Sequence, residues 1–417
     1  MTQTGTVSGR LTDWVSLGVL ASWVPRDAVD DAIQETGRAA RRAGGKLPPH
    51  VMVYFVMALA LFADEDYEEV AARLAGALRG WECWDDSWEV PTSGGITQAR
   101  KRLGFEPLEE LFAQVAVPVA EEETAGAFLG PWRLMAIDGV EWDVPATAEN
   151  IAAFGLHGSH EGGQAAFPKA RVVAISECGS HAVTAAVIGG TVGKGTGEQP
   201  LARKLYPLLE KDWLLIADRN FYTWQDWCTA ADTGAALLWR VKAESRMRLP
   251  VLAPLPDGSY RSVLIPVKIR GAARERLIEA ARRGEDLDPA RARHVRVIEY
   301  EVPDRSGNGK NELIRLITTI TGPAPAAVLA RAYHERWEHE TGNKQLKTYL
   351  RGPGKVLRSQ SPDMVRQEIY GYLLTHYAIS ALTCQAATAA GIDPDRVKFK
   401  RTVRIIRRRV ADPVFSP

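Results

Sequence analysis

The sequence predicts an α/β fold in which helices cover a mixed β-sheet, preceded by a separate helical region. Three observations support this fold class. Residues 10–130 carry apolar side chains at helical spacing, whereas strand patterns that alternate with helices begin at residue 131. Residues 245–312 then interrupt the alternation and are too long for a simple loop. We therefore expect an inserted, partly β segment inside the sheet domain.

The helical region contains segments with helical apolar spacing at 27–42, 51–63, 67–78 and 108–120. The run 51–62 is the most apolar, but its twelve residues are too few to span a bilayer, so a buried helix is expected. No signal-peptide pattern opens the chain. These features predict no membrane association.

A short basic helix is predicted near the end of this region. The Ser/Thr/Gly turn 92–95 is followed by an apolar-spaced stretch, 96–103, whose second half carries Arg100, Lys101 and Arg102. Two interpretations stay open. The helix contacts DNA, or its cations complement the dipole at an exposed helix end.

Strand patterns dominate from residue 133 onward. The first, 133–144, contains Asp138-Gly139, and two more follow around a turn at 177–180. After a helix at 200–210, the apolar run 213–218 ends on Asp218. A helix at 222–232 and a strand at 235–241 complete the series, and a ribonuclease-H-like core has this order. In that order the first and fourth strands are neighbours, so Asp138 and Asp218 can converge.

The later part of the chain returns to this core after the insertion. The insertion carries strand candidates at 260–266 and 295–302 and a charged helix at 272–283. A strand at 313–319 follows it, and Ser361-Pro362 begins a long apolar helix to about residue 384.

The spacing Tyr333-x2-Arg336-x3-Glu340-x6-Lys347 is the most informative motif. At about 100° per residue, these four side chains lie within roughly 60° of one another on an α-helix. A carboxylate suited to a metal ion is then flanked by groups suited to phosphate.

Three carboxylates, Asp138, Asp218 and Glu340, are therefore candidate catalytic metal ligands. Oxygen ligands without clustered Cys or His favour Mg²⁺ or Mn²⁺ over zinc. Two such ions activate a water or a 3′-hydroxyl and stabilise the leaving oxygen of a phosphodiester. Simpler interpretations remain: Asp138 forms a turn with Gly139, Asp218 caps a helix or forms a local ion pair, and Glu340 is a solvated helix acid.

The charge is unevenly distributed. The chain carries +1, yet residues 396–409 contain eight cations and no acid, which leaves −7 for the rest. Such a tail is either a solvated, mobile end or a phosphate-binding arm. The cations Arg240 and Lys242 likewise either contact DNA or occupy exposed strand positions. The four cysteines form no C-x-x-C pair, and a reducing cytosol fits.

The acid and Y-R-E-K motifs together resemble the bacterial DDE transposases of the insertion-sequence-four family. The segments 92–100, 166–173, 237–242 and 365–370 also resemble family segments, so the resemblance covers nearly the whole chain. It implies a ribonuclease-H-like catalytic domain with a β-rich insertion, and Asp138, Asp218 and Glu340 as ligands of two Mg²⁺ or Mn²⁺ ions. It also implies that Tyr333, Arg336 and Lys347 contact phosphates near the transposon end.

The function implied is a cut-and-paste transposase. It binds the inverted-repeat ends of an insertion sequence as double-stranded DNA, cleaves them, with or without a hairpin intermediate, and joins them to target DNA. A dimer on paired ends and a bacterial cytoplasmic, nucleoid-associated location go with this function. The alternatives are a catalytically silent DNA-binding protein or repressor and a nuclease without strand transfer.

The expected organisation has five parts. They are a helical DNA-binding domain (1–130), the first part of the catalytic core (131–244), the β-rich insertion (245–312), the second part of the core (313–390) and a basic tail (391–417). One departure from certain relatives stands out, because the strand 313–319 lacks the Trp that stacks a flipped base in them. Another residue, such as Trp239 or Trp337, would have to take that role, and the other interpretation of Trp337 is a core residue or a brace for the Y-R-E-K helix.

Overall fold

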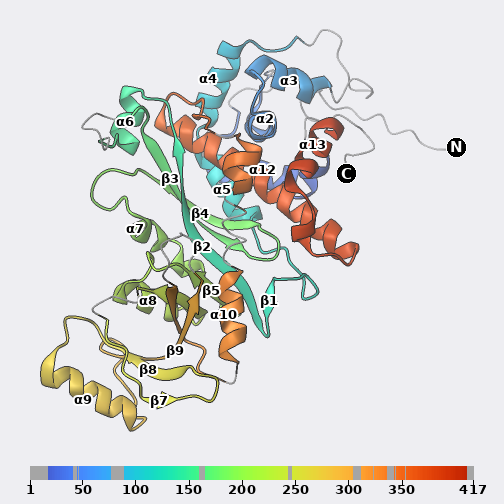
Figure 1. Cartoon of the computed structure of the whole chain (residues 1–417). Helices are drawn as coiled ribbons and strands as arrows, with labels where there is room; N and C mark the ends of the chain where they lie inside the picture. The colour runs from blue at the N-terminus through green and yellow to red at the C-terminus, as the bar shows by residue number, and fades with distance from the viewer. Residues whose placement is uncertain are drawn as a thin grey trace.

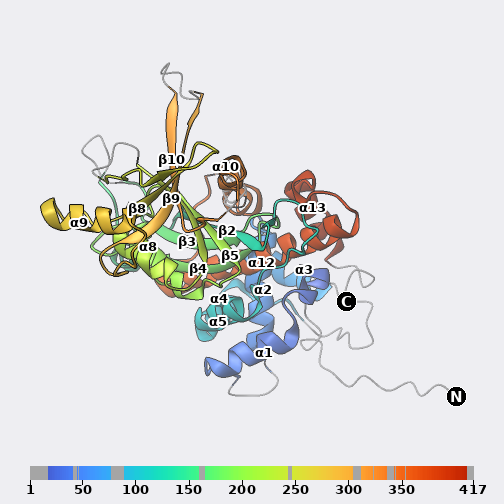
Figure 2. The ribbon, with the colours of Figure 1, turned by 90° about the horizontal axis from the view of Figure 1, so that it is seen from below.

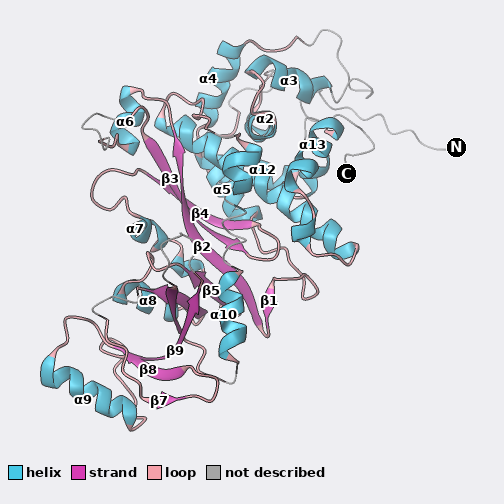
Figure 3. Cartoon of the chain, viewed as in Figure 1, coloured by secondary structure: helices cyan, strands magenta, loops and turns pink. Residues whose placement is uncertain are grey.

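The computed structural model describes residues 17–40, 45, 47–76, 89–158, 165–242, 247–303, 311–322, 324–335, 342, 344–352 and 354–410, without the Lys347 side chain. Helices from the two ends of the chain gather at one end of a long β-sheet (Figures 1 and 3). The insertion lies at the other end, so the core separates the helical region from it.

The N-terminal helical region forms as the apolar spacing predicts. Its helices are η2 (Gly18–Ser22), α1 (Arg26–Glu35), α2 (Pro49–Leu61), α3 (Tyr67–Gly76), α4 (Ser93–Leu103) and α5 (Glu106–Val115). Helix α2 is buried along nearly its whole length, which confirms the prediction for the apolar run. No helix in the described ranges is long and apolar enough to cross a membrane.

Helix α2 packs against the long helix α12 (Pro362–Ala389) from the far end of the chain. Gly371 permits this close approach, because an added Cβ would lie 2.8 Å from the Val56 carbonyl oxygen. The Thr375 hydroxyl also donates to the Met57 carbonyl over 3.0 Å. The helical region is thus joined to the second part of the core through a shared interior.

One ten-stranded sheet runs through the rest of the molecule. Its strands are β1 (Phe128–Leu129), β2 (Trp132–Asp143), β3 (Lys169–Glu177), β4 (Val183–Gly189), β5 (Trp213–Ala217), β6 (Ala236–Val241), β7 (Ala253–Pro254), β8 (Tyr260–Leu264), β9 (Arg293–Val302) and β10 (Glu312–Thr318). Their order is β4-β3-β2-β5-β6-β10-β9-β8-β7, with β1 paired to β2. The pairs β2–β5 and β5–β6 are parallel. The first five core strands therefore have the predicted ribonuclease-H-like order.

The insertion extends this sheet. Strand β10 pairs antiparallel with β6 on one side and with β9 on the other, and β8 and β7 follow. Helix α9 (Gly271–Arg282) accompanies these strands at the far end (Figure 1). Within its described residues, 247–303 and 311–312, the inserted segment therefore contains strands and one helix, and its strands are continuous with the sheet of the catalytic core.

Different helices cover the two faces of the sheet, and α8 and α10 lie on opposite sides of the strands (Figure 2). Helices α7 (Glu198–Ala202) and α8 (Trp224–Ala231) share one apolar cluster with one face. Helix α10 (Ala326–His334) packs on the other face. The π-helix η4 (Gln345–Leu350) and α12 pack further along that second face.

Several expected helix bounds differ. Helix α1 stops at Glu35, and Gly37 follows with a φ of 67°, a conformation that suits glycine. The helix expected at 200–210 is divided into α7 and the short η3 (Tyr206–Leu208). Helix α6 (Ala148–Phe154) was not expected. Strand bounds are closer to expectation, because their apolar runs are bounded by clear turns.

Candidate active site and DNA-contacting residues

Asp138 and Asp218 lie side by side at the centre of the sheet. Strands β2 and β5 pair in parallel with Ile137 opposite Ala217, so these aspartates occupy the next position on each chain. Their predicted convergence is confirmed at the level of the backbone.

Both aspartates belong to the face that α10 covers. Along β2, Leu134 and Ala136 join the apolar cluster of α10, whereas Met135 and Ile137 join that of α7 and α8. Because side chains alternate along a strand, Asp138 falls on the α10 face. The same alternation along β5 assigns Asp218 to that face.

Asp138 is not part of a turn. Strand β2 continues through Gly139 as far as Asp143, so the turn interpretation of this Asp-Gly pair is wrong. Instead, the Asp138 Oδ1 atom accepts a 2.8 Å hydrogen bond from the Gly139 amide. This bond orients the carboxylate from within its own strand.

Gly139 closely approaches a residue that the sequence did not single out. An added Cβ at this position would meet the carboxylate of Glu198, the first residue of α7, so this flexible side chain would have to shift. Glu198 is half-buried, and its burial, together with the charges of Asp138 and Asp218, raises the pKa of its carboxyl group. The helix pattern here was read as beginning at residue 200, which left Glu198 out.

We expect Gly139→Ala to destabilise the protein by up to about 1 kcal/mol, because the added methyl forces the half-buried Glu198 carboxylate to shift. Urea unfolding measures this loss. The double variant Gly139→Ala/Glu198→Ala removes the obstacle and should recover most of it. If the stability losses of Gly139→Ala and Glu198→Ala simply add in the double variant, the proposed contact is contradicted.

The Y-R-E-K motif is only partly described. Tyr333 lies in the last turn of α10, which ends at His334, and Lys347 lies in the π-helix η4. Arg336 and Glu340, like Trp337, lie outside the described residues. The expectation of one regular α-helical face for all four side chains stays a prediction, because most residues between Tyr333 and Lys347 lie outside the described ones. The backbone at Lys347 is π-helical, a period that differs from that of an α-helix.

The two described ends of this motif flank Asp138 along β2. Tyr333 is 2% exposed and packs in the cluster that contains Leu134 and Ala136. Leu346 of η4 packs in the cluster that contains Trp142. Asp138 lies between these two contact regions on the same strand. Such burial of Tyr333 does not fit a direct phosphate contact in this arrangement.

A buried polar chain holds η4 in place. The Gln345 Nε2 atom lies 3.0 Å from His181 Nδ1, and its Oε1 atom lies 3.2 Å from His376 Nε2 on α12. His181 Nε2 in turn lies 3.0 Å from Asp395 Oδ1. The segment after Glu340 is therefore tied to the turn between β3 and β4, to α12 and to the C-terminal region.

The insertion holds the start of α10. Asp257, in the turn between β7 and β8, accepts a 2.8 Å hydrogen bond from the Ala326 amide at the first turn of α10. The buried Arg296 bonds both to Asp257 and to the Ala324 carbonyl. Hydrogen bonds from Ser259 and from this amide lower the pKa of Asp257 to about 2. The insertion thus fixes the helix that leads into the Y-R-E-K motif.

We expect Asp257→Asn to weaken α10 by about 1–2 kcal/mol at neutral pH, because a charged cap is lost. The pKa of Asp257 is lowered from 3.8 to about 2 in the folded protein, so its stabilisation is present above pH 3.8. This stabilisation is lost as the pH falls from 3.8 toward 2. The difference in α10 stability between the wild type and Asp257→Asn should therefore narrow between these pH values. Hydrogen exchange of the α10 amides measures it. Asp286→Asn, at an exposed acid of the insertion, should show no such difference.

The end of β6 brings cations beside the acid pair. Ala217 of β5 lies opposite Trp239 of β6, so Arg240 is at the position next to Asp218, on the α10 face by alternation. Arg240 forms an ion pair with Glu312, and Lys242 is exposed just beyond the strand. Trp239 is fully buried on the opposite face against Trp227, so the suggestion that it stacks a flipped base is wrong.

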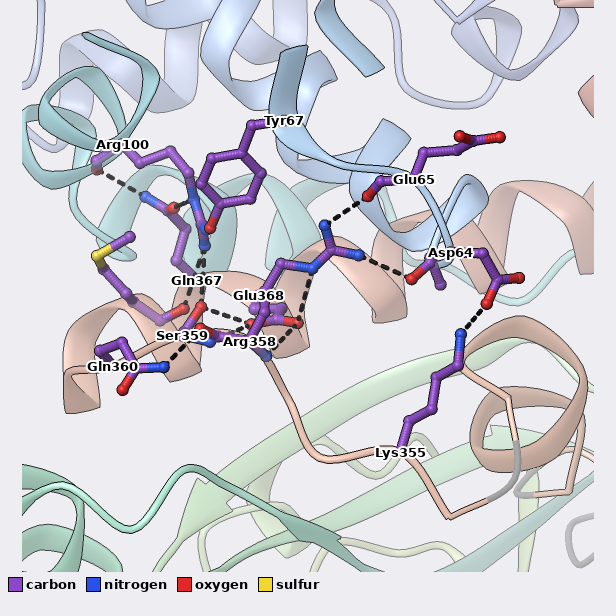
Figure 4. Close-up of polar contacts among 12 residues, drawn as sticks. Asp64, Glu65, Tyr67, Arg100, Lys355, Arg358, Ser359, Gln360, Gln367 and Glu368 are labelled. Atoms are coloured by element: carbon purple, nitrogen blue, oxygen red, sulfur yellow. Dashed lines mark hydrogen bonds and ion pairs between the residues drawn. The ribbon is translucent and has the colours of Figure 1, made fainter. Parts of the chain in front are cut away.

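The predicted basic helix forms as α4 but begins three residues earlier than expected, at Ser93, because the Thr92 side chain caps it by accepting from the Gly95 amide. Arg100 does not fit the predicted DNA contact, because it is 0% exposed. Its guanidinium donates to Gln367 Oε1 over 2.8 Å, to Ser359 Oγ over 3.2 Å and to the Tyr67 hydroxyl (Figure 4). Lys101 and Arg102 are exposed on the same helix.

The donor set at the acid pair fits a hard divalent cation. Asp138 and Asp218 supply carboxylate oxygens, and Glu198 adds negative charge on the other side of Gly139. Among the described residues, no group of three or more His, Cys, Asp or Glu side chains is placed to hold a metal ion. Glu340, the third predicted ligand, is outside those residues.

The fold and the paired carboxylates define a ribonuclease-H-like protein with an acidic centre. A family model described as the insertion element 4 transposase N-terminal region matches residues 14–113, and one described as a transposase DDE domain matches residues 131–377. The second model spans more than half of the chain. The chain belongs to the DDE transposases of the insertion-sequence-four family.

Two relatives from Escherichia coli agree with this assignment. The transposase InsG of insertion sequence element IS4 from Escherichia coli K12 is 26% identical over 93% of this chain and 82% of its own. The putative transposase InsZ of the same strain is 25% identical over 55% of this chain and 72% of its own. A solved piggyBac transposase synaptic complex with hairpin DNA has a TM-score of 0.48 and 9% identity, covering 95% of this chain and 80% of that one.

Proposed function

We propose that this transposase cleaves the ends of its insertion sequence at the Asp138–Asp218 pair and joins them to target DNA. The observation that carries the proposal is the placement of the two carboxylates, at adjacent positions on parallel central strands and on the α10 face. We propose Glu340 as the third acid, because it lies in the chain between α10 and η4, which pack on either side of Asp138.

Asp138, Asp218 and Glu340 would hold two Mg²⁺ or Mn²⁺ ions. When bound, these ions lower the pKa of an attacking water or 3′-hydroxyl and stabilise the leaving oxygen. The chain's own contribution is to fix the acids. The Gly139 amide orients Asp138, and the β2–β5 pairing sets the register of Asp218.

We further propose cationic contacts to DNA phosphates around this centre. Arg240 and Lys242 lie beyond Asp218 at the end of β6, and Arg336 and Lys347 belong to the Y-R-E-K motif. Tyr333 belongs to α10 and packs against the sheet, so it would reach DNA only if α10 moved away from the strands. We therefore propose that its main role is to hold α10 on the sheet. Lys101 and Arg102 on α4 are proposed as contacts of the helical region.

The proposed working form is a dimer on paired ends. The five-part division at residues 130, 244, 312 and 390 is retained as its functional organisation, with the helical part binding DNA and the insertion supporting α10. The Asp257–Ala326 contact supports that role of the insertion.

The test uses duplexes that carry the element's own ends, with Mg²⁺. The wild type should cleave them, and Asp138→Ala should not. Equal cleavage by both proteins contradicts the site assignment. Joining of a precut 3′-end to target DNA separates a transposase from a plain nuclease, and closed ends on a denaturing gel indicate a hairpin. Binding of the ends without cleavage under any condition favours a silent DNA-binding protein.

A further inference from the structure

The basic C-terminal segment is a docked helix over residues 399–409. Helix α13 (Phe399–Arg409) buries Phe399, Val403 and Ile406 in the apolar interior that it shares with α2, η4 and α12. The Arg407 Nε atom donates to the Leu61 carbonyl at the end of α2 over 2.5 Å. Of the two interpretations of this basic tail, a solvated and mobile end does not describe these residues.

The exposed side of α13 is a row of cations. At about 100° per residue, Lys400, Arg404, Arg408 and Arg401 lie within roughly 100° of one another, on the side away from the buried residues. All four are exposed, and none forms an ion pair with another residue in the described part of the chain. We call these four residues the α13 cation row.

The chemistry of this row fits a nucleic-acid backbone. Residues 396–409 contain no acid, whereas the rest of the chain sums to −7, so the positive charge is concentrated here. The row extends about 12 Å along the helix, and duplex DNA carries one charge per about 1.7 Å of its axis. The apolar side of α13 is buried in the protein, and Ile405 alone among its large apolar residues is exposed, which is too little apolar surface to enter a membrane.

The position of α13 connects it to the catalytic centre. It packs directly on η4, the segment that carries Lys347, and Phe399 stacks near His376 with ring centroids 5.3 Å apart. His376 contacts Gln345 of η4. A duplex held on α13 would therefore be held by an element that braces the segment next to Glu340.

We propose that the α13 cation row binds the phosphate backbone of the same duplex whose end is cut at the acid pair. The contact is sequence-independent, because Lys and Arg on this face meet phosphate rather than base edges. The proposal rests on the proposed function for its partner, double-stranded DNA. It assigns the contact to four named side chains outside the catalytic domain's acidic centre.

The test replaces Lys400, Arg401, Arg404 and Arg408 together by Gln and measures affinity for a random-sequence duplex against salt concentration. Each lost phosphate contact lowers the slope of log K against log salt by about 0.9, so a decrease of about 3–4 is expected. The matched control replaces four exposed cations at the far end of the insertion, Lys268, Arg276, Arg282 and Arg283, by Gln. Its slope should stay at the wild-type value.

An unchanged slope in the α13 variant overturns the proposal, and so does an equal decrease in the control. Loss of binding to a poly-glutamate probe with duplex binding intact also overturns it and points to an acidic protein partner. Thermal unfolding checks that both variants are folded. DNA binding is measured without divalent ions and therefore does not depend on cleavage. If the wild type failed to cleave DNA, the proposed function would be contradicted, but the salt dependence of binding by the α13 cation row would still stand.

Discussion

Asp218→Asn should abolish cleavage of the element's ends while leaving end binding intact. Asn has nearly the same shape as Asp but no charge, so β5 and its register with β2 are preserved. The amide is a much weaker ligand for a hard cation. We expect a rate loss of at least about 10³-fold, equivalent to roughly 4 kcal/mol of transition-state stabilisation.

The matched control for this variant is Asp212→Asn. Asp212 is exposed at the opposite end of β5. Asp212→Asn therefore makes the same chemical change next to this strand but away from the acid pair. Single-turnover cleavage should stay at the wild-type rate. If Asp212→Asn and Asp218→Asn lose activity equally, the acid pair is not the catalytic centre.

Arg100→Met should destabilise the protein by about 3–5 kcal/mol. The substitution leaves Gln367 Oε1, Ser359 Oγ and the Met364 carbonyl without their buried donor. It also removes the guanidinium from the Tyr67 ring, which it covers at 5.5 Å. Because these partners come from α3, α12 and the loop before α12, the helical region should loosen from the core.

Lys101→Met on the same helix provides the comparison. Its side chain is exposed, so the free energy of unfolding should change by less than about 0.5 kcal/mol. DNA affinity should show the opposite order: Lys101→Met should weaken binding more than Arg100→Met, because the exposed Lys101 side chain can contact phosphate. If Arg100→Met is as stable as Lys101→Met and binds DNA more weakly, the structural role of Arg100 is wrong.

The sequence predicted the core of this fold because its strands are short apolar runs ended by turns or acids. Strand β5, with every residue buried, is the clearest case. The neighbourhood of Asp138 and Asp218 then followed from strand order alone. What could not be predicted were contacts between distant segments, such as Glu198 beneath Gly139 or Asp257 at the start of α10.

Arg100 shows how a local pattern can mislead. Three neighbouring cations suggested an exposed surface, yet Arg100 shares the buried side of α4 with Ile96, Ala99 and Leu103. That spacing of three or four residues was the signal that it faces inward. Its partner Gln367 is 267 residues away, so no local reading could reveal the hydrogen bond.

The Y-R-E-K motif, unlike the cluster of cations at Arg100, led to a correct inference. Its spacing identified the family correctly, and the stretch that carries Lys347 forms a π-helix, which the α-helical spacing argument did not anticipate. The buried contacts of Gln345 with His181 and His376 accompany that irregular segment. Residue types and spacing therefore identified the family without predicting the local backbone.

The central claim is that Asp138 and Asp218 jointly hold the catalytic ions. The most direct measurement uses electron paramagnetic resonance to count the Mn²⁺ ions that bind to the protein on a duplex carrying the element's own end. The wild type and Asp212→Asn should bind about two ions per site, whereas Asp138→Ala/Asp218→Ala should lose them at the same Mn²⁺ concentration. Equal binding by all three proteins would contradict the claim.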